Sequence, residues 1–140
     1  MSKGQSIART KAKRTTVDGI EFGSKAEAAR WSELRMLERG GAIRFLVRQP
    51  SFVIFRAGGV RINYTADFEY VENEQKIVEE IKGLADTAYL LRRKMFVALN
   101  PLLPLYEVRG RKKLRVYLTP GGLCRTRIEA LPGAARGGTR

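Results

Sequence analysis

The clearest pattern in the chain is a strict alternation of apolar and polar residues from Val60 to Tyr70. Successive side chains of a strand point to opposite faces, so this alternation predicts a strand with one apolar and one polar face. The apolar face holds Val60, Ile62, Tyr64, Ala66, Phe68 and Tyr70, and the polar face holds Arg61, Asn63, Thr65, Asp67 and Glu69.

Turn residues predict neighbouring strands on both sides of this one. Gly58-Gly59 predicts a hairpin that leads back to a strand at Ser51–Phe55. A short apolar segment, Ile43–Val47, comes earlier and is broken by Gln49-Pro50. These signals are typical of several short strands in succession.

A second turn, Asn73-Glu74, leads to a strand expected at Lys76–Lys82. The connection is tight, so we expect an antiparallel pair in which Asp67 lies roughly opposite Glu80. Because the side-chain period of a strand is two, Glu80 and Lys82 share one face.

Two segments favour helices. Ser24-Lys25-Ala26-Glu27 fits a capping box and predicts a helix from Ser24 to about Arg39, stopped by Gly40-Gly41. On this helix Glu27 shares a face with Trp31 and Leu34. A second helix is expected from Asp86 or Thr87 to about Leu99. Its predicted buried stripe is Leu91, Met95, Ala98 and Leu99.

Further strands are expected at Leu102–Val108 and Arg111–Leu118. The order of elements predicts an α/β fold with a mixed central sheet flanked by helices. The unit from Lys76 to Val108 is expected to be a right-handed parallel crossover. We expect a flexible basic arm at 1–14, one domain at 15–119, and a basic, disordered tail at 120–140.

The chain is strongly basic, with 27 Lys+Arg against 14 Asp+Glu and a formal net charge of +13. This excess indicates a polyanionic partner, and nucleic acid fits best. The residues expected to contact phosphates are Lys13, Arg14, Arg92, Arg93 and Lys94. A solvated helix face is the alternative for the last three.

Other features of the composition exclude several classes. The chain has no apolar run near the ~20 residues that a membrane span requires, and its basic N-terminus lacks the apolar segment of a secretory signal. We therefore expect no membrane association and a cytoplasmic location. The single Cys124 excludes an intrachain disulfide, and the absence of histidine removes the commonest general base.

Asp67, Glu80 and Lys82 together form a candidate metal and catalytic site. Two facing carboxylates repel one another, and a divalent cation would relieve that repulsion. Oxygen ligands suit Mg²⁺ or Mn²⁺, and the lysine could stabilise charge on a phosphate. The same spacing also suits a surface ladder of carboxylates paired with lysine, so both interpretations remain open.

Glu27 also has two interpretations. It fits the capping box as the residue that closes the helix N-terminus. Its position on the apolar face favours a second role, because a carboxylate that points inward usually has a partner.

The ordered set of motifs resembles the PD-(D/E)XK nuclease superfamily, and within it a phage-encoded family of small nucleases related to archaeal-type Holliday junction resolvases. The resemblance covers about residues 14–109, and Ala66 replaces the proline of the superfamily's nominal motif. The matching motifs are Thr16-Val17-Asp18-Gly19, Ser24-Lys25-x-Glu27, Gln49-Pro50, Ala66-Asp67-Phe68, Val78-Glu79-Glu80-Ile81-Lys82-Gly83 and Thr87-x-Tyr89.

The resemblance implies a restriction-endonuclease-like core and a role for each matching residue. Glu27, Asp67 and Glu80 would bind the metal, with the Ile81 carbonyl as a further ligand. Lys82 would be the catalytic lysine, and Gln49 would orient the site. The implied protein is a homodimeric, metal-dependent endonuclease that resolves four-way DNA junctions, in the host cytoplasm if phage-encoded.

Two alternatives to this function remain. One is another nuclease of the superfamily, of the restriction or transposition type. The other is a basic nucleic-acid-binding module without catalytic activity.

Overall fold

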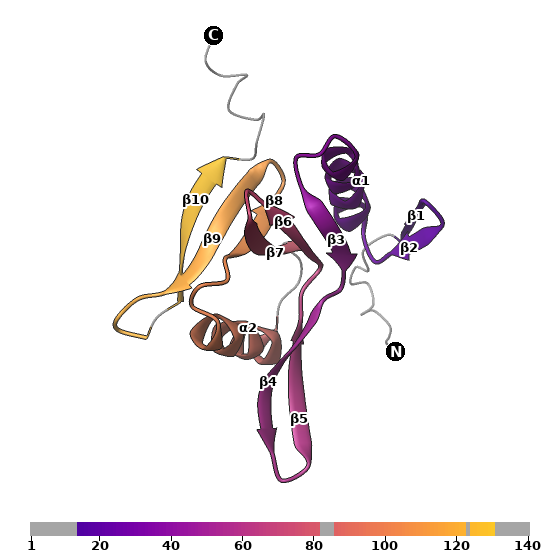
Figure 1. Cartoon of the computed structure of the whole chain (residues 1–140). Helices are drawn as coiled ribbons and strands as arrows, with labels where there is room; N and C mark the ends of the chain where they lie inside the picture. Colours follow the sequence, from indigo (N-terminus) through magenta and orange to yellow (C-terminus); the bar gives the residue numbers. More distant parts are fainter. Residues whose placement is uncertain (1–13, 82–85, 123, 131–140) are drawn as a thin grey trace, which may run out of the picture.

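The computed structural model describes residues 14–81 and 86–122, and the backbone of residues 124–130. Two helices and a series of strands make up this part of the chain (Figure 1). In chain order they are β1 (Thr15–Val17), β2 (Ile20–Phe22), α1 (Lys25–Arg39), β3 (Arg44–Arg48), β4 (Ser51–Ala57), β5 (Val60–Thr65), β6 (Phe68–Glu72), β7 (Gln75–Ile81), α2 (Thr87–Leu99), β8 (Leu105–Arg109), β9 (Lys112–Leu118) and β10 (Cys124–Ala130).

The centre of the molecule is a six-stranded sheet in the order β10-β9-β8-β7-β6-β3. Strands β7 and β8 are parallel, and every other pair in the sheet is antiparallel. The predicted parallel pairing across α2 is therefore confirmed, as is the mixed α/β architecture. The β1–β2 and β4–β5 hairpins are separate two-stranded units.

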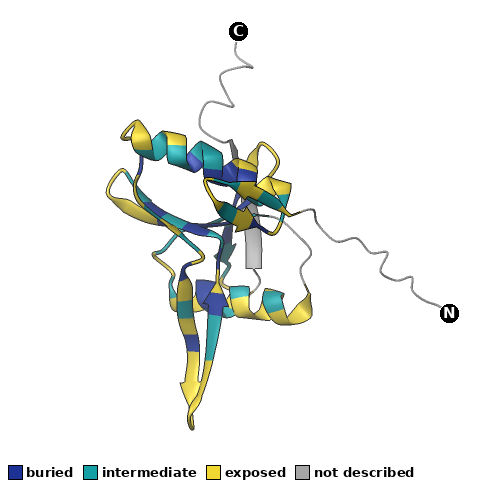
Figure 2. Ribbon diagram, turned by 90° about the vertical axis from the view of Figure 1, so that its right-hand side faces the viewer, coloured by how far each residue is buried: buried dark blue, intermediate teal, exposed yellow. Residues whose placement is uncertain are grey.

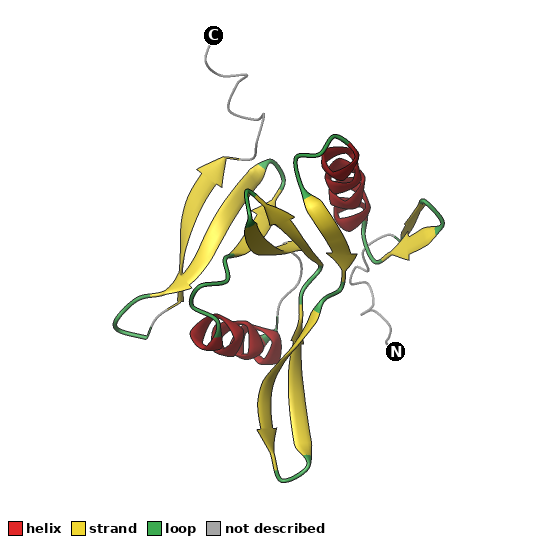
Figure 3. Ribbon diagram, in the orientation of Figure 1, coloured by secondary structure: helices red, strands yellow, loops and turns green. Residues whose placement is uncertain are grey.

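The two helices cover opposite faces of this sheet (Figure 3). Consecutive residues of β7 point to opposite faces, so Ile77 packs in the cluster under α1 and Val78 in the cluster under α2. Trp31 and Leu34 of α1 are buried as predicted. Figure 2 shows that burial concentrates on the sheet and the inner faces of the helices, whereas the β4–β5 hairpin extends into solvent.

The expected continuous strand from Val60 to Tyr70 is divided in two. Strand β5 pairs with β4, and β6 pairs with β3 and β7, so the partner changes at Ala66-Asp67. Backbone hydrogen bonds hold this crossing together: Ala66 N donates to Pro50 O at 3.0 Å and Gln49 N donates to Asp67 O at 2.8 Å. Asp67 therefore lies where the hairpin leaves the central sheet.

Helix α2 has the predicted limits, and the Asp86 side chain caps it by accepting from Tyr89 N at 2.8 Å. Its predicted buried stripe is confirmed only for Met95, which packs against the cluster under α2, because Leu91 and Leu99 are each 57% exposed and Ala98 is also exposed. The buried face instead carries Phe96, whose ring packs between Phe52 and Tyr64 with centroid distances of 4.7 and 4.8 Å. Aromatic packing against the hairpin, rather than the leucines, orients this helix.

The C-terminal boundary also differs from the expectation. Strand β10 pairs with β9 along its whole length, from Cys124 opposite Leu118 to Ala130 opposite Lys112. The predicted disordered tail is therefore wrong for 124–130, while 131–140 and the arm up to residue 13 lie outside the described residues. In the described part of the chain, no helix is long and apolar enough to cross a bilayer.

Candidate active site

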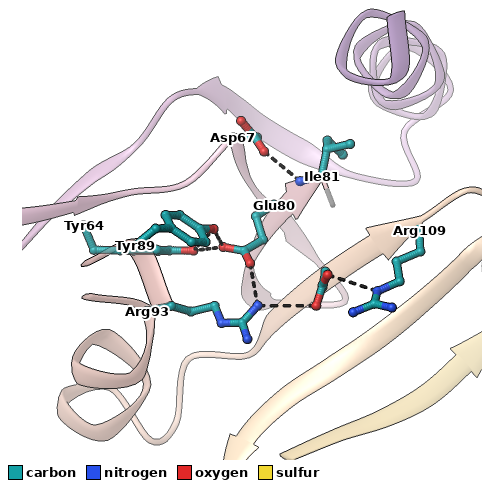
Figure 4. A network of polar contacts seen from close by, with 8 residues as sticks. Tyr64, Asp67, Glu80, Ile81, Tyr89, Arg93 and Arg109 are labelled. Carbon is teal, nitrogen blue, oxygen red and sulfur yellow. Dashed lines mark hydrogen bonds and ion pairs between the residues drawn. The ribbon is translucent and has the colours of Figure 1, made fainter. Parts of the chain in front are cut away.

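Asp67 is held at the crossing between β5 and β6 by contacts to the neighbouring strand β7. Its backbone N–H donates to Glu79 O at 3.1 Å, and its carboxylate accepts from Ile81 N at 2.7 Å (Figure 4). The pKa of Asp67 is raised to about 7. Burial is the largest cause of this raised pKa, the hydrogen bond from the Ile81 amide acts against it, and the Glu27 carboxyl adds to the rise. A positive charge close to Asp67 would therefore stabilise its ionised carboxylate.

Glu27 acts as the capping residue that the sequence predicted. Its N–H donates to Ser24 Oγ at 3.1 Å, while its Oε1 accepts from Gly23 N at 3.1 Å. This is a variant of the capping box, because the glutamate closes on the residue before the cap. The same carboxyl interacts with Asp67, so the N-terminus of α1 brings a second acidic group to the crossing.

The register of β6 and β7 pairs Phe68 with Glu79, and its continuation places Glu80 opposite Asp67, as predicted. The Glu80 carboxylate, however, points toward α2. Only 3% of the residue is exposed. Its carboxylate accepts hydrogen bonds from the hydroxyls of Tyr64 and Tyr89 and pairs with Arg93 Nη1 at 2.9 Å (Figure 4). Burial raises the pKa of both tyrosines, and the neighbouring Glu80 carboxylate raises it further.

Arg93 was predicted to contact phosphates, and most of its side chain is buried. Its guanidinium lies between Glu80 and Glu107, with a 3.3 Å contact to the latter, and Arg109 pairs with Glu107 at 3.0 Å. One arginine therefore bridges two carboxylates that are almost completely buried. Its neighbours Arg92 and Lys94 are exposed, as a DNA-contacting role requires.

Three of the remaining predicted residues are described by the structure, and two are not. Arg14 is exposed but pairs with Glu21 at 2.8 Å, and Gln49 is exposed with its backbone bonded to Asp67. Ile81 reaches Asp67 through its N–H, whereas the prediction concerned its carbonyl. Lys13 and Lys82 lie outside the described residues.

A second buried ionic cluster was not predicted from the sequence. Glu79 is fully buried under α1, where Arg30 binds it through two nitrogens at 2.9 and 2.7 Å. Tyr70 donates to it and Lys113 Nζ lies 3.8 Å away, and together these groups hold the pKa of Glu79 below its usual range despite burial. The signal was present: consecutive glutamates on a strand covered on both faces must both be buried.

The donor chemistry of the crossing suits a hard divalent cation. Asp67 and Glu27 offer adjacent carboxyl oxygens. A bound cation would lower the raised pKa of Asp67, because it stabilises the ionised carboxylate. Glu80 does not fit as it stands, since its carboxylate is engaged by two tyrosines and an arginine. Accordingly, no three acidic, histidine or cysteine side chains of the described residues form a metal-binding group.

Comparison with known proteins provides a family but no activity. Residues 7–115 match the family model DUF1064, which is described as a protein of unknown function. No curated protein and no solved structure matches the chain. The match covers well over half of the sequence, and the chain therefore belongs to the DUF1064 family.

Proposed function

We propose that the protein is a metal-dependent DNA endonuclease with a restriction-endonuclease-like core, and that its substrate is the four-way DNA junction. The observation that carries the proposal is the contact between the Asp67 and Glu27 carboxyls. These residues come from a strand crossing and a helix N-terminus that are distant in the sequence. Two half-buried acidic groups side by side repel one another in the absence of a cation, and such an arrangement is typical of functional sites.

Asp67 and Glu27 would hold Mg²⁺ or Mn²⁺, with Glu80 and the Ile81 carbonyl as further ligands. The bound ion would supply an activated water and neutralise phosphate charge. The Ile81 amide fixes the direction of the Asp67 carboxylate. Glu80 would turn toward the ion by exchanging its tyrosine hydrogen bonds, and Lys82 would stabilise the charge that develops on the phosphate.

The substrate follows from charge and from the motif resemblance. A net charge of +13 favours a polyanion, and Arg92 and Lys94 offer exposed cations on α2. Recognition of a branched junction needs shape and backbone contacts rather than base contacts. Two symmetric cuts require two sites, so the proposal includes a homodimer that works in the cytoplasm.

A second candidate is a basic DNA-binding module without catalytic activity. The observation in its favour is the full hydrogen bonding of Glu80 by Tyr64, Tyr89 and Arg93. A buried carboxylate satisfied in this way is also what a purely structural role requires.

A cleavage assay separates these candidates. A labelled four-way junction and a linear duplex of the same sequence are incubated with the protein in Mg²⁺ or in EDTA. Paired cuts in the junction, only in Mg²⁺, are expected. Equal cleavage of the linear duplex would instead indicate a restriction-like or transposition-type nuclease, and binding without cleavage in Mg²⁺ or Mn²⁺ would indicate the module.

A further inference from the structure

We propose that the β4–β5 hairpin is a DNA-contacting arm, in which Arg56 and Arg61 bind backbone phosphates of the duplex that reaches Asp67. The inference deepens the proposed function and rests on it for the position of the cleaved strand. The hairpin joins the sheet at the Asp67 crossing, packs against α2 at its base, and extends beyond α2 at its tip (Figures 1 and 2).

The outer half of the hairpin is exposed and does not contribute to the hydrophobic core. Only its base packs inward, where Phe52, Ile54 and Tyr64 belong to or contact the cluster under α2. Beyond that base, Arg56 and Arg61 are exposed, and so are the apolar residues Phe55 and Val60. An exposed two-stranded ribbon has the dimensions to enter the major groove of duplex DNA.

Arg56 and Arg61 are direct partners across the two strands and therefore lie on the same face. The segment 51–65 contains no Asp or Glu. Among the described residues, neither guanidinium has a carboxylate within ion-pair distance. Like charges in opposed positions destabilise a hairpin, and a phosphate between them would remove that cost.

The face that carries this arginine pair continues toward the candidate active site. Asn63 and Thr65 follow Arg61 at alternate positions, and both contact Ser51 on the partner strand, at 2.9 and 3.4 Å. The Asn63 Oδ1 is buried without a hydrogen-bond partner in the described structure. Asn63, Thr65 and Arg92 line one cavity at this point, beside α2. A polar path thus runs from the arginine pair to Thr65, two residues before Asp67, where Asp86 at the start of α2 also lines the cavity.

The length of this path suits a duplex. Arg61 and Asp67 are six residues apart, so at ~3.3 Å per residue an extended chain separates them by at most ~20 Å. At 3.4 Å per base pair, that span equals at most about six base pairs. Binding of phosphates at both ends would fix the direction of the duplex relative to the carboxyls.

Salt-dependent binding tests the arm directly. Affinity for a labelled duplex and for a four-way junction is measured across a salt series in EDTA, so that no cleavage interferes. Each phosphate contact adds about 0.9 to the slope of log affinity against log salt, so R56A/R61A should reduce the slope by about 1.8. R56K/R61K should keep it, because the charges remain.

The matched control removes two charges elsewhere. Arg39 ends α1 and Lys112 begins β9, and both are exposed on elements far from the arm. R39A/K112A should leave the slope unchanged.

An unchanged slope in R56A/R61A would overturn the inference, as would an equal loss in the control or a wild-type protein that binds no DNA. If F55S/V60S lowers the solution mass while the R56A/R61A slope is unchanged, the arm joins a second copy instead, which also overturns it. If R56A/R61A reduces the slope as expected but the wild-type protein does not cleave in Mg²⁺, only the nuclease activity is refuted.

Discussion

At the scale of single residues, Asp67 is a carboxyl group whose ionisation is strongly altered by its surroundings. Burial and the Glu27 carboxyl raise its pKa to about 7 from an ordinary value of 3.8. Between these two values the folded protein keeps a proton that the unfolded chain releases. The contribution of Asp67 to stability is therefore present below pH 4 and lost as the pH rises to 7 and above.

Asp67→Asn should remove this pH dependence in metal-free buffer. The asparagine carries no charge at any pH, so the free energy of unfolding should fall less between pH 4 and pH 8 than in the wild type. We expect a difference of roughly 2 kcal/mol, about half of the full shift at 1.4 kcal/mol per pKa unit, because water reaches part of the side chain.

Urea denaturation in EDTA at several pH values measures this difference. Glu69→Gln is the matched control, since Glu69 is two residues away and pairs with Lys76 at 3.0 Å. Parallel pH profiles for wild type and Asp67→Asn would show that Asp67 titrates normally.

Much of the candidate site could be predicted because it depends on periodicity. Alternation and a tight turn predict Asp67 opposite Glu80, and the capping box predicts the position of Glu27. The direction of the Glu80 carboxylate could not be predicted, because tyrosines from β5 and α2 determine it. Those partners are brought together only by tertiary packing.

At the scale of elements, the Arg30–Glu79 pair fastens α1 to β7. Both side chains are buried, and the pairing uses two nitrogens and both carboxylate oxygens. This contact fixes the helix whose N-terminus carries Glu27, so it positions the candidate site without touching it.

Arg30→Met should destabilise the fold by about 3–5 kcal/mol, because it leaves the Glu79 carboxylate buried without its main partner. Arg39→Met, on the exposed end of the same helix, should change stability by less than about 0.5 kcal/mol. Thermal or urea unfolding compares the two variants. A small effect of Arg30→Met would mean that Tyr70 and Lys113 alone satisfy Glu79.

The N-terminal ends of the two helices could be predicted from local signals, whereas the buried face of α2 could not. Ser24 and Asp86 cap their helices where predicted, since caps act within one turn. The buried face of α2 was mispredicted because its leucines outnumber Tyr89 and Phe96, the aromatic residues that contact the hairpin. The break at Ala66-Asp67 arises from a change of partner strand, which alternation cannot reveal.

At the scale of the whole molecule, apolar surface remains near the C-terminal end of α2. Leu99 is 57% and Leu102 87% exposed, and Leu103 is partly exposed, whereas Phe96 on the same helix is fully buried. Contiguous exposed apolar side chains often mark a contact with another chain.

We predict a homodimer, with Leu102→Glu shifting the protein toward monomer because it introduces charge at the interface. Light scattering at working concentration gives the mass directly. Leu90→Glu, on a less exposed residue at the other end of α2, is the control and should remain dimeric. A wild-type monomer, with and without junction DNA, would favour an enzyme that nicks single strands.

The most direct test of the account is the single-turnover rate at which Asp67→Asn cleaves a labelled four-way junction in Mg²⁺, measured beside its affinity for that junction. Loss of one metal-binding charge should cost several kcal/mol in the transition state, a rate at least about 10³-fold below wild type, with affinity nearly unchanged. Glu69→Gln should cleave normally. Near-normal cleavage by folded Asp67→Asn would contradict the account.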